Sequence, residues 1–280
     1  LTIPFFVVGQ DAARPENAAA IRSLSDAGHE IGNHSFRHQP WLHRYTLEEL
    51  HEEFRRTEEA LEEVTGQRTV GFRGPGYSLS PDVIRVLLDR GYRYDCSTLP
   101  TVIGPLARRY YFRTAELTAE QREERSYLFG SARDGLRSLK PYQWEMGDER
   151  LLEIPVTTMP LSRVPVHVSY VLYLAGISPV IARQYFANSM RLCRLRGVEP
   201  SILLHPLDFL GADDVDSLRF FPGMGMTGAQ KRQTVLDCLD ELNRQFRVVS
   251  MREHAEAILE RGDLPLKSAS TSRPHIKADA

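Results

Sequence analysis

The chain has 280 residues, of which 42% are hydrophobic and 26% charged, and this composition excludes a collagen-like, coiled-coil or wholly disordered protein. The 35 basic residues nearly balance the 37 acidic ones, for a net charge of −2, so no basic excess indicates binding to nucleic acid or to an anionic membrane. Three widely spaced cysteines exclude a disulfide framework and a cysteine-based zinc site. Polar residues and a proline interrupt the most apolar stretch, residues 164–182, which predicts a buried helix or loop rather than a transmembrane segment.

Short apolar runs alternate with longer amphipathic segments along most of the chain. The runs predict strands at residues 3–8, 29–32, 69–73, 92–95, 151–155, 201–205 and 247–250. Because helices that connect parallel strands produce this alternation, the pattern predicts an α/β fold whose parallel sheet is either open or closed into a barrel.

Capping residues mark the predicted helix boundaries. Thr46 and Glu49 have the spacing of a capping box, and Gly66 marks the end of the same helix. Comparable start signals precede three further helices, at Ser80, Ser178 and Thr227.

Two regions depart from the alternation. Residues 104–147 are rich in charged and aromatic side chains, which predicts an insertion over one face of the fold. Residues 262–280 are rich in serine, proline and lysine, which predicts a disordered tail. The sequence therefore predicts one domain, residues 1–261, that carries the insertion.

His34 and His38 directly follow the predicted strand at 29–32. A spacing of four residues brings two imidazoles to one face of a helix or turn, where both can reach one metal ion. The spacing alone is a weak signal, because histidine is also an ordinary surface residue and Ser35 stands where an HExxH motif requires glutamate. The position at the C-terminal end of a strand favours the metal interpretation, because parallel α/β folds build their sites there.

Three more polar residues end apolar strands: Arg73, Asp95 and His205. Each of them has a possible separate explanation, such as a core histidine or a capping aspartate. One cleft at the C-terminal strand ends explains all three together. We expect His205 and Arg73 to line this cleft, with Asp95 close enough to hydrogen-bond to one of them. Cys96 is interpreted as structural, because no histidine is placed to activate its thiol.

Four segments together resemble successive motifs of the NodB-like polysaccharide deacetylases, carbohydrate esterase family 4. They are GHEIGNHSFRH at 28–38, GFRGPGY at 71–77, GYRYDCS at 91–97 and LLHP at 203–206. They occur in the family's order, and the resemblance extends from about residue 1 to residue 258. It implies a distorted (β/α)7 barrel, the NodB homology domain, and metal-dependent removal of acetyl groups from an N-acetylated or O-acetylated glycan.

The resemblance also implies roles in the reaction. His34 and His38 would bind a divalent metal ion, with zinc expected for histidine ligands, and His205 would be the general acid.

Further residues would support these groups. Arg73 would hold the catalytic base, and Asp95 loosely matches the position that orients the catalytic histidine. The loop at Tyr77 would offer a backbone N–H to the oxyanion. Trp41 and Tyr77 are candidates to stack on sugar rings, although packing of Trp41 beneath the Pro40 turn explains that residue equally well.

One family motif is absent. The family's first motif is a strand that ends in Asp-Asp and supplies a third metal ligand and the base. It should come before the strand that begins at Leu1, and residues 1–8 contain no Asp-Asp. Asp213 and Asp214 follow the last motif and are poor substitutes, and Asp11 is interpreted as a turn residue or helix cap. Because the chain starts without Met inside an apolar run, we expect a truncated deacetylase whose first strand is missing, with weak metal binding and little activity.

Two alternative functions also agree with the sequence. The missing Asp-Asp motif favours a catalytically impaired barrel that serves as a glycan-binding or scaffold module. An amidohydrolase acting on a small non-sugar amide would use the same residues.

Overall fold

The computed structural model describes residues 1–104, 135–218 and 223–269. These residues form two compact units. The sheet unit comprises Thr2–Ser97, Pro141–Glu153 and the described part of Ser250–Ala280. The helical unit comprises the described part of Thr98–Lys140 together with Ile154–Val249.

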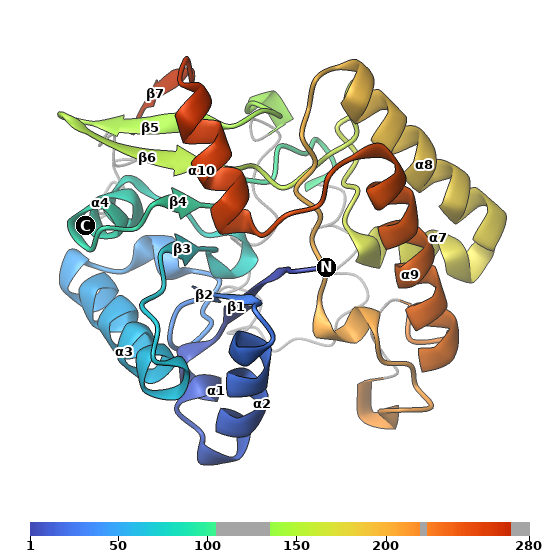
Figure 1. Ribbon diagram of the computed structural model, residues 1–280, viewed down its shortest axis with the longest axis horizontal. Coiled ribbons are helices and arrows are strands. Elements are labelled where there is room, and N and C mark those ends of the chain that lie inside the picture. Colours follow the sequence, from blue (N-terminus) through green and yellow to red (C-terminus); the bar gives the residue numbers. More distant parts are fainter. Residues whose placement is uncertain (105–134, 219–222, 270–280) are drawn as a thin grey trace, which may run out of the picture. The chain divides into compact units, whose positions relative to one another are not determined.

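The sheet unit is built on a seven-stranded sheet with the order β1-β2-β3-β4-β6-β5-β7 (Figure 1). The strands are β1 (Pro4–Val7), β2 (Glu30–Asn33), β3 (Gly71–Phe72), β4 (Tyr94–Asp95), β5 (Tyr142–Met146), β6 (Glu149–Glu153) and β7 (Leu266–Ser268). All neighbouring pairs are parallel except the β5–β6 hairpin. The predicted α/β class with a parallel sheet is confirmed, and the closed (β/α)7 barrel stays a prediction.

Helices connect the parallel strands of the sheet unit. They are α1 (Gly9–Ala12), α2 (Pro15–Asp26), α3 (Leu47–Thr65), α4 (Pro81–Asp89) and α10 (Met251–Arg261), with the 3₁₀ turns η1 (Leu42–Arg44) and η2 (Pro75–Tyr77). The capping box of α3 is confirmed, because Glu49 N donates to Thr46 Oγ1 while Thr46 N donates to Glu49 Oε2. Gly66 ends α3 with φ +69°, a conformation that favours glycine.

The core of the sheet unit joins α3 to the sheet. The Phe54 ring of α3 lies 4.7 Å from the Phe72 ring of β3 and 5.6 Å from the Tyr92 ring, centroid to centroid. All three side chains are buried. This packing anchors α3 beneath the strand ends that carry the polar residues.

In the described part of the helical unit, the structure has three helices and two 3₁₀ turns. They are α7 (Val168–Ile177), α8 (Pro179–Leu195), α9 (Gly228–Gln245), η5 (Pro206–Asp208) and η6 (Asp216–Leu218). The predicted caps at Ser178 and Thr227 are confirmed, and α7 is the buried helix predicted within residues 164–182.

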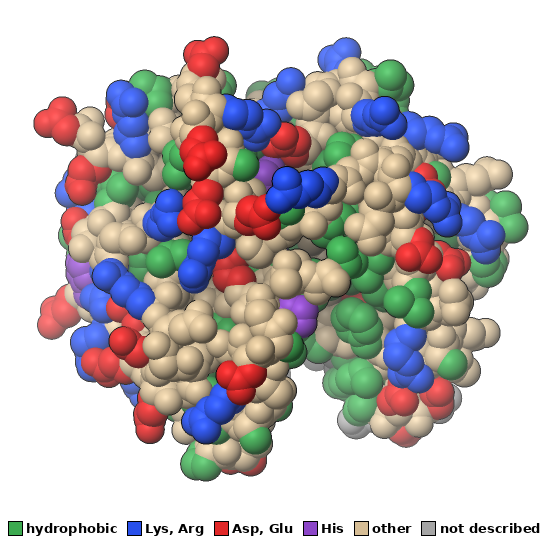
Figure 2. Space-filling model, in the orientation of Figure 1, with side chains coloured by type: hydrophobic (Ala, Val, Ile, Leu, Met, Phe, Trp, Pro, Cys, Tyr) green, Lys and Arg blue, Asp and Glu red, His purple; other side chains and the backbone are tan. Residues whose placement is uncertain are grey.

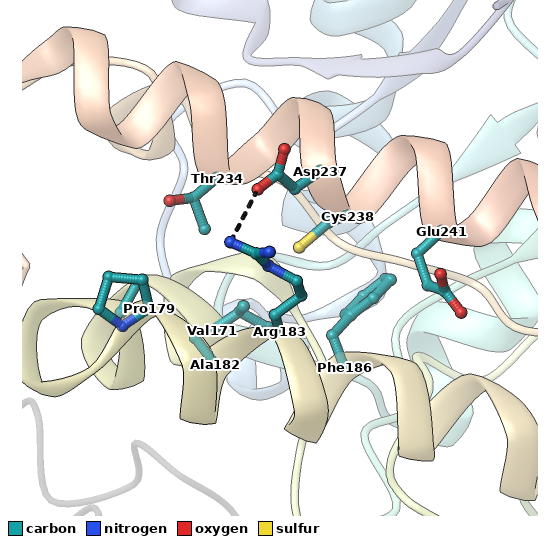
Figure 3. A pocket seen from close by; sticks show the side chains of 10 residues that line it. Val171, Pro179, Ala182, Arg183, Phe186, Thr234, Asp237, Cys238 and Glu241 are labelled. Carbon is teal, nitrogen blue, oxygen red and sulfur yellow. Dashed lines mark ion pairs between the residues drawn. The ribbon is translucent and has the colours of Figure 1, made fainter.

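Helices α7, α8 and α9 enclose a small cavity of about 30 Å³ (Figure 3). Arg183 of α8 and Asp237 of α9 form an ion pair of 4.0 Å beside it. Burial, together with Asp237, raises the pKa of the lining Cys238 to about 12, so this thiol stays protonated. The cavity has room for a water molecule or two and none for a sugar ring, so it is not a substrate site.

Five of the seven predicted strands are observed. The strands predicted at residues 201–205 and 247–250 are wrong. Residues 201–205 make single backbone bonds, Thr157 N to Ser201 O and Val168 N to Leu203 O, without a ladder. An apolar run does not distinguish such a segment from a paired strand. Residues 247–250 lead into α10, whose first turn is capped by Ser250 Oγ.

The predicted tail and insertion are corrected in part. Residues 266–268 form β7, and Ala269 is buried in the core, because the chain pairs with β5 despite its polar composition. Residues 142–147, at the end of the predicted insertion, form β5 and the turn of the β5–β6 hairpin, which has Gly147 at φ +63°. Residues 105–134 and 270–280 lie outside the described residues, and the single domain 1–261 stays a prediction.

The surface is mixed in charge. Figure 2 shows acidic and basic side chains interspersed over the visible face, in keeping with the net charge of −2. Within the described ranges, no helix combines the length and apolar character needed to cross a bilayer.

Candidate metal centre and acid–base residues

His34 and His38 converge in the loop that follows β2. Their Nε2 atoms lie 3.2 Å apart, and the ring centroids are 4.8 Å apart at an interplanar angle of 61°. The two imidazoles thus lie together, as their spacing predicts. Their role as metal ligands stays a prediction.

The donor set fits a zinc ion. His34 Nδ1 lies 2.6 Å from the carbonyl oxygen of Arg73, which can only accept, so Nδ1 carries the proton and Nε2 presents its lone pair. Two nitrogens bound to one tetrahedral zinc ion at the usual distance are separated by about 3.3 Å, close to the observed 3.2 Å. Among the described residues, no cluster of three or more His, Cys, Asp and Glu side chains is suited to hold a metal ion.

Glu53 of α3 accepts hydrogen bonds from the histidine loop, residues 34–38. Its Oε2 accepts hydrogen bonds of 3.0 Å from the backbone N–H groups of Phe36 and Arg37, and its Oε1 lies 3.0 Å from Arg37 Nη1. The Glu53 side chain is only 3% exposed, so these bonds are shielded from water. One buried carboxylate therefore fixes the backbone between the two histidines.

The loop has an unusual backbone, because Ser35 and His38 have φ values of +62° and +57° without being glycines. Asn33 Oδ1 accepts from Ser35 N at 2.7 Å, and Ser35 Oγ accepts from His38 N at 3.1 Å. These bonds, with those to Glu53, maintain the left-handed conformation that turns His38 back towards His34.

Arg73 directly follows β3 and is 8% exposed. Its backbone carbonyl holds His34, its Nε donates to Cys96 O at 3.2 Å, and its guanidinium lies 4.6 Å from the centre of the Phe6 ring. Arg73 therefore links the histidine loop to the segment after β4.

Asp95 ends β4 and pairs in register with Glu153 of β6, and neither residue is exposed. Ser97 Oγ donates to Asp95 Oδ1, and Trp144 Nε1 donates to Glu153 Oε2 at 3.0 Å. Burial, followed by the charge of Glu153, raises the pKa of Asp95 well above its usual value. The neighbouring carboxyl group of Glu153 and the burial of the site therefore favour the protonated form of Asp95.

Sequence reasoning missed Glu153 and its pairing with Asp95. The available signal was a glutamate inside an otherwise apolar predicted strand, at 151–155.

Tyr77 lies in η2 with φ +62°. Its backbone N–H donates to Gly74 O at 3.0 Å, so this N–H is already paired and the oxyanion role of the loop stays a prediction. A Cβ at Gly74 would lie 2.1 Å from Ser78 O, so the loop requires glycine there. Trp41 precedes η1 and is half-buried, and its stacking on a sugar likewise stays a prediction.

The acidic residues considered as substitutes for Asp-Asp have structural contacts. Asp213 Oδ1 accepts from Gly228 N at 2.8 Å, and Asp214 Oδ2 accepts from Gly211 N at 2.9 Å. Asp11 lies in the first turn of α1, with an exposed side chain 3.7 Å from Arg14. The interpretation of Asp11 as a helix-terminal residue agrees with this placement.

His205 of the helical unit has neighbours that the sequence did not indicate. Its Nδ1 lies 3.0 Å from Ser169 Oγ, and Ser169 Oγ donates to Asp208 Oδ1 at 2.7 Å. The His167 ring packs edge to face with the His205 ring at 5.9 Å. Arg73 and Asp95 belong to the sheet unit, so the predicted cleft that they share with His205 stays a prediction.

Comparisons with known proteins agree with the resemblance. The family model for polysaccharide deacetylase matches residues 1–94. A peptidoglycan deacetylase of Helicobacter pylori is 26% identical over 96 residues, which are 34% of this chain and 31% of that protein. The chain thus spans about a third of the length of this curated relative.

The chain also resembles solved structures. A Mycobacterium smegmatis protein classed with the polysaccharide deacetylases has a TM-score of 0.58 at 21% identity, over 98% of this chain and 76% of that one. A family 4 carbohydrate esterase of Streptomyces lividans, solved with acetate, is 26% identical over 34% of this chain and 48% of its own, with a TM-score of 0.31. Residues 1–94 thus match the polysaccharide deacetylase family.

Proposed function

We propose that this chain is a metal-dependent hydrolase that removes acetyl groups from an N-acetylated or O-acetylated glycan. The observation that carries the proposal is the pair of imidazoles of His34 and His38, with Nε2 atoms 3.2 Å apart. The bond from His34 Nδ1 to the Arg73 carbonyl supports it, because a ligand histidine in a metal site is usually oriented by such a partner.

The proposed chemistry divides between the metal and the protein. A bound zinc ion would lower the pKa of its water molecule and polarise the acyl carbonyl. His34 and His38 would hold the ion through their Nε2 atoms. His205 would protonate the departing amine or alkoxide, which makes a poor leaving group into a neutral one.

The remaining site residues are proposed to support the reaction from the sheet unit. Arg73 would hold the base carboxylate, and Asp95 would maintain the arrangement at the end of β4. The loop at Tyr77 would bind the acyl oxygen, and Trp41 would pack against a sugar ring.

The test uses zinc titration by calorimetry together with acetate release from an N-acetylglucosamine oligomer. We expect His34→Ala and His38→Ala each to abolish zinc binding and acetate release together. His51→Ala is the matched control, because His51 lies on α3 with a half-exposed side chain that pairs with Asp89. Undiminished zinc binding by the His34→Ala variant would contradict the metal assignment.

A glycan-binding module without catalysis is the second candidate. The observation that favours it is the lack of a three-residue metal cluster among the described residues. Oligosaccharide binding that is unaffected by zinc, without acetate release, would support it. Acetate release by a longer gene product with an upstream Asp-Asp strand would support the enzyme instead.

An amidohydrolase for small amides would use the same histidines. A panel of acetylated sugars and simple acetamides separates the two activities, because a site for glycans should prefer oligomers through its additional contacts.

A further inference from the structure

The His205 imidazole is connected to a buried carboxylate through one hydroxyl group. Asp208 is 3% exposed, and its Oδ2 accepts from His205 N at 2.8 Å while lying 3.9 Å from His205 Nδ1. The shorter path from the ring runs through Ser169 Oγ, 3.0 Å from Nδ1 and 2.7 Å from Asp208 Oδ1. Asp208 therefore holds both the backbone and, through Ser169, the ring of His205.

The donors in this chain follow from the chemistry of the groups. An ionised carboxylate only accepts, so the single hydroxyl proton of Ser169 points to Asp208. The lone pairs of Ser169 Oγ then face His205 Nδ1, which must carry a proton to make its 3.0 Å bond. Because Nδ1 keeps its proton for the bond to Ser169, the proton that the imidazolium can give up is the one on Nε2.

The surrounding groups favour this arrangement. His167 is buried, and burial together with His205 lowers its pKa to about 3, so it stays neutral at physiological pH. Lys231 of α9 is also buried, and its Nζ donates to Leu207 O at 2.9 Å, next to Asp208 in the chain. Burial lowers the pKa of Lys231, whereas the charge of the neighbouring Asp208 acts to raise it.

We propose that Ser169 and Asp208 are the positioning residues of His205, holding Nδ1–H so that Nε2 delivers the proton. This inference rests on the proposed function, in which His205 is the general acid. In the step, the Nε2–H bond breaks and the proton goes to the departing nitrogen or oxygen of the sugar. The neutral imidazole keeps its proton on Nδ1, and solvent water restores the proton on Nε2.

The first measurement does not depend on activity. In the ¹⁵N-labelled 280-residue chain, we expect the neutral His205 ring to be mainly the Nδ1–H tautomer, and Ser169→Ala to shift it towards a mixture of both tautomers. Ser169→Thr retains the hydroxyl and should restore the Nδ1–H form. Ser189→Ala is the matched control, because Ser189 Oγ donates within α8 to Tyr185 O. An unchanged tautomer ratio in Ser169→Ala overturns the inference.

The second measurement is acetate release as a function of pH. We expect Ser169→Ala and Asp208→Asn to lower kcat roughly tenfold with KM unchanged, and to move the alkaline limb of the profile to lower pH, because the imidazolium loses its partner. Asp237→Asn, which removes an exposed carboxylate of α9, should leave the profile unchanged. Unaltered kcat and pH profile in Ser169→Ala refute the positioning role even if the tautomer ratio changes.

Failure of the proposed function is distinguishable from failure of this inference. Absence of acetate release both by this chain and by a longer gene product with an upstream Asp-Asp strand refutes the deacetylase proposal, and the tautomer measurement then decides the inference by itself.

Discussion

Glu53 determines the position of the histidine loop through a few bonds from one buried carboxylate. The backbone N–H groups of Phe36 and Arg37 both point at its Oε2. A carboxylate accepts such bonds more strongly than a neutral amide does, and burial increases the difference. The geometry of the two imidazoles therefore depends on a residue that lies on another element.

We predict that Glu53→Gln weakens zinc binding by roughly tenfold to a hundredfold, the usual effect of removing a group that orients metal ligands. The amide retains one acceptor oxygen but loses the charge, so the loop between His34 and His38 gains freedom. Calorimetric zinc titration measures the loss. Glu59→Gln, on the exposed side of α3, is the control and should bind zinc as the wild type does. Equal zinc affinity of the Glu53→Gln variant would show that the loop does not need this carboxylate.

Asp95 introduces a pH dependence into the stability of the sheet unit. Burial and the neighbouring Glu153 raise its pKa in the folded protein above the unfolded value of about 3.9. As the pH rises above that value, the unfolded chain releases the proton while the folded chain keeps it. The folded state thus binds more protons, and this contribution to stability is present at low pH and lost as the pH rises towards the folded pKa.

We predict that Asp95→Asn gains stability relative to the wild type between pH 5 and pH 8, because the asparagine donates to Glu153 without needing a proton. Urea denaturation at both pH values measures the difference. The control is Asp26→Asn, at the exposed end of α2, which should follow the wild type at both values. A difference between Asp95→Asn and wild type that does not vary with pH would contradict the raised pKa of Asp95.

At the scale of elements, the helices that carry the site obtain their boundaries from local sequence. In α3, Thr46 and Glu49 satisfy each other's backbone N–H groups, and the next turn brings Leu50 and Phe54 onto the buried face. Helix α3 then carries Glu53 to the histidine loop. The cap at Thr46 lies seven residues before Glu53. Because it fixes where the helix begins, it helps to place Glu53 at the histidine loop.

We predict that Thr46→Ala lowers the free energy of unfolding by about 1 kcal/mol, the usual cost of losing an N-terminal cap. Urea denaturation measures it. Thr46→Ser retains the hydroxyl and is expected to remain near the wild type. A loss in the serine variant as large as in the alanine variant would assign the effect to the threonine methyl group rather than to the cap.

At the scale of the molecule, the sheet is completed by a segment remote in sequence. Strand β7 pairs with β5, Gln143 N donates to Pro265 O at 2.9 Å, and Ala269 N donates to Glu145 O at 3.0 Å. Lys267 Nζ also lies 3.9 Å from the centre of the Tyr142 ring. Residues near the C-terminal end therefore protect the edge of the β5–β6 hairpin.

We predict that a chain ending at Asp263 is less stable than one ending at Ala269 by an amount on the order of 2 kcal/mol, because several backbone hydrogen bonds and the burial of Ala269 are lost. Thermal and urea unfolding of the two chains provide the comparison. Identical unfolding curves would mean that β7 contributes nothing to the stability of the sheet.

Sequence by itself determined the helix caps, the α/β class and the approach of His34 to His38, because these depend on neighbours within a few residues or on a repeating pattern. Tertiary structure alone decided that β7 joins the sheet, that Glu153 faces Asp95, and that Ser169 and Asp208 hold His205. The first two depend on strand register, and Ser169 reaches His205 from a helix 36 residues away in the sequence, although Asp208 lies only three residues after His205. Polar residues in 266–268 form a strand because β5 offers unpaired backbone groups, whereas the apolar run at 201–205 finds no such edge.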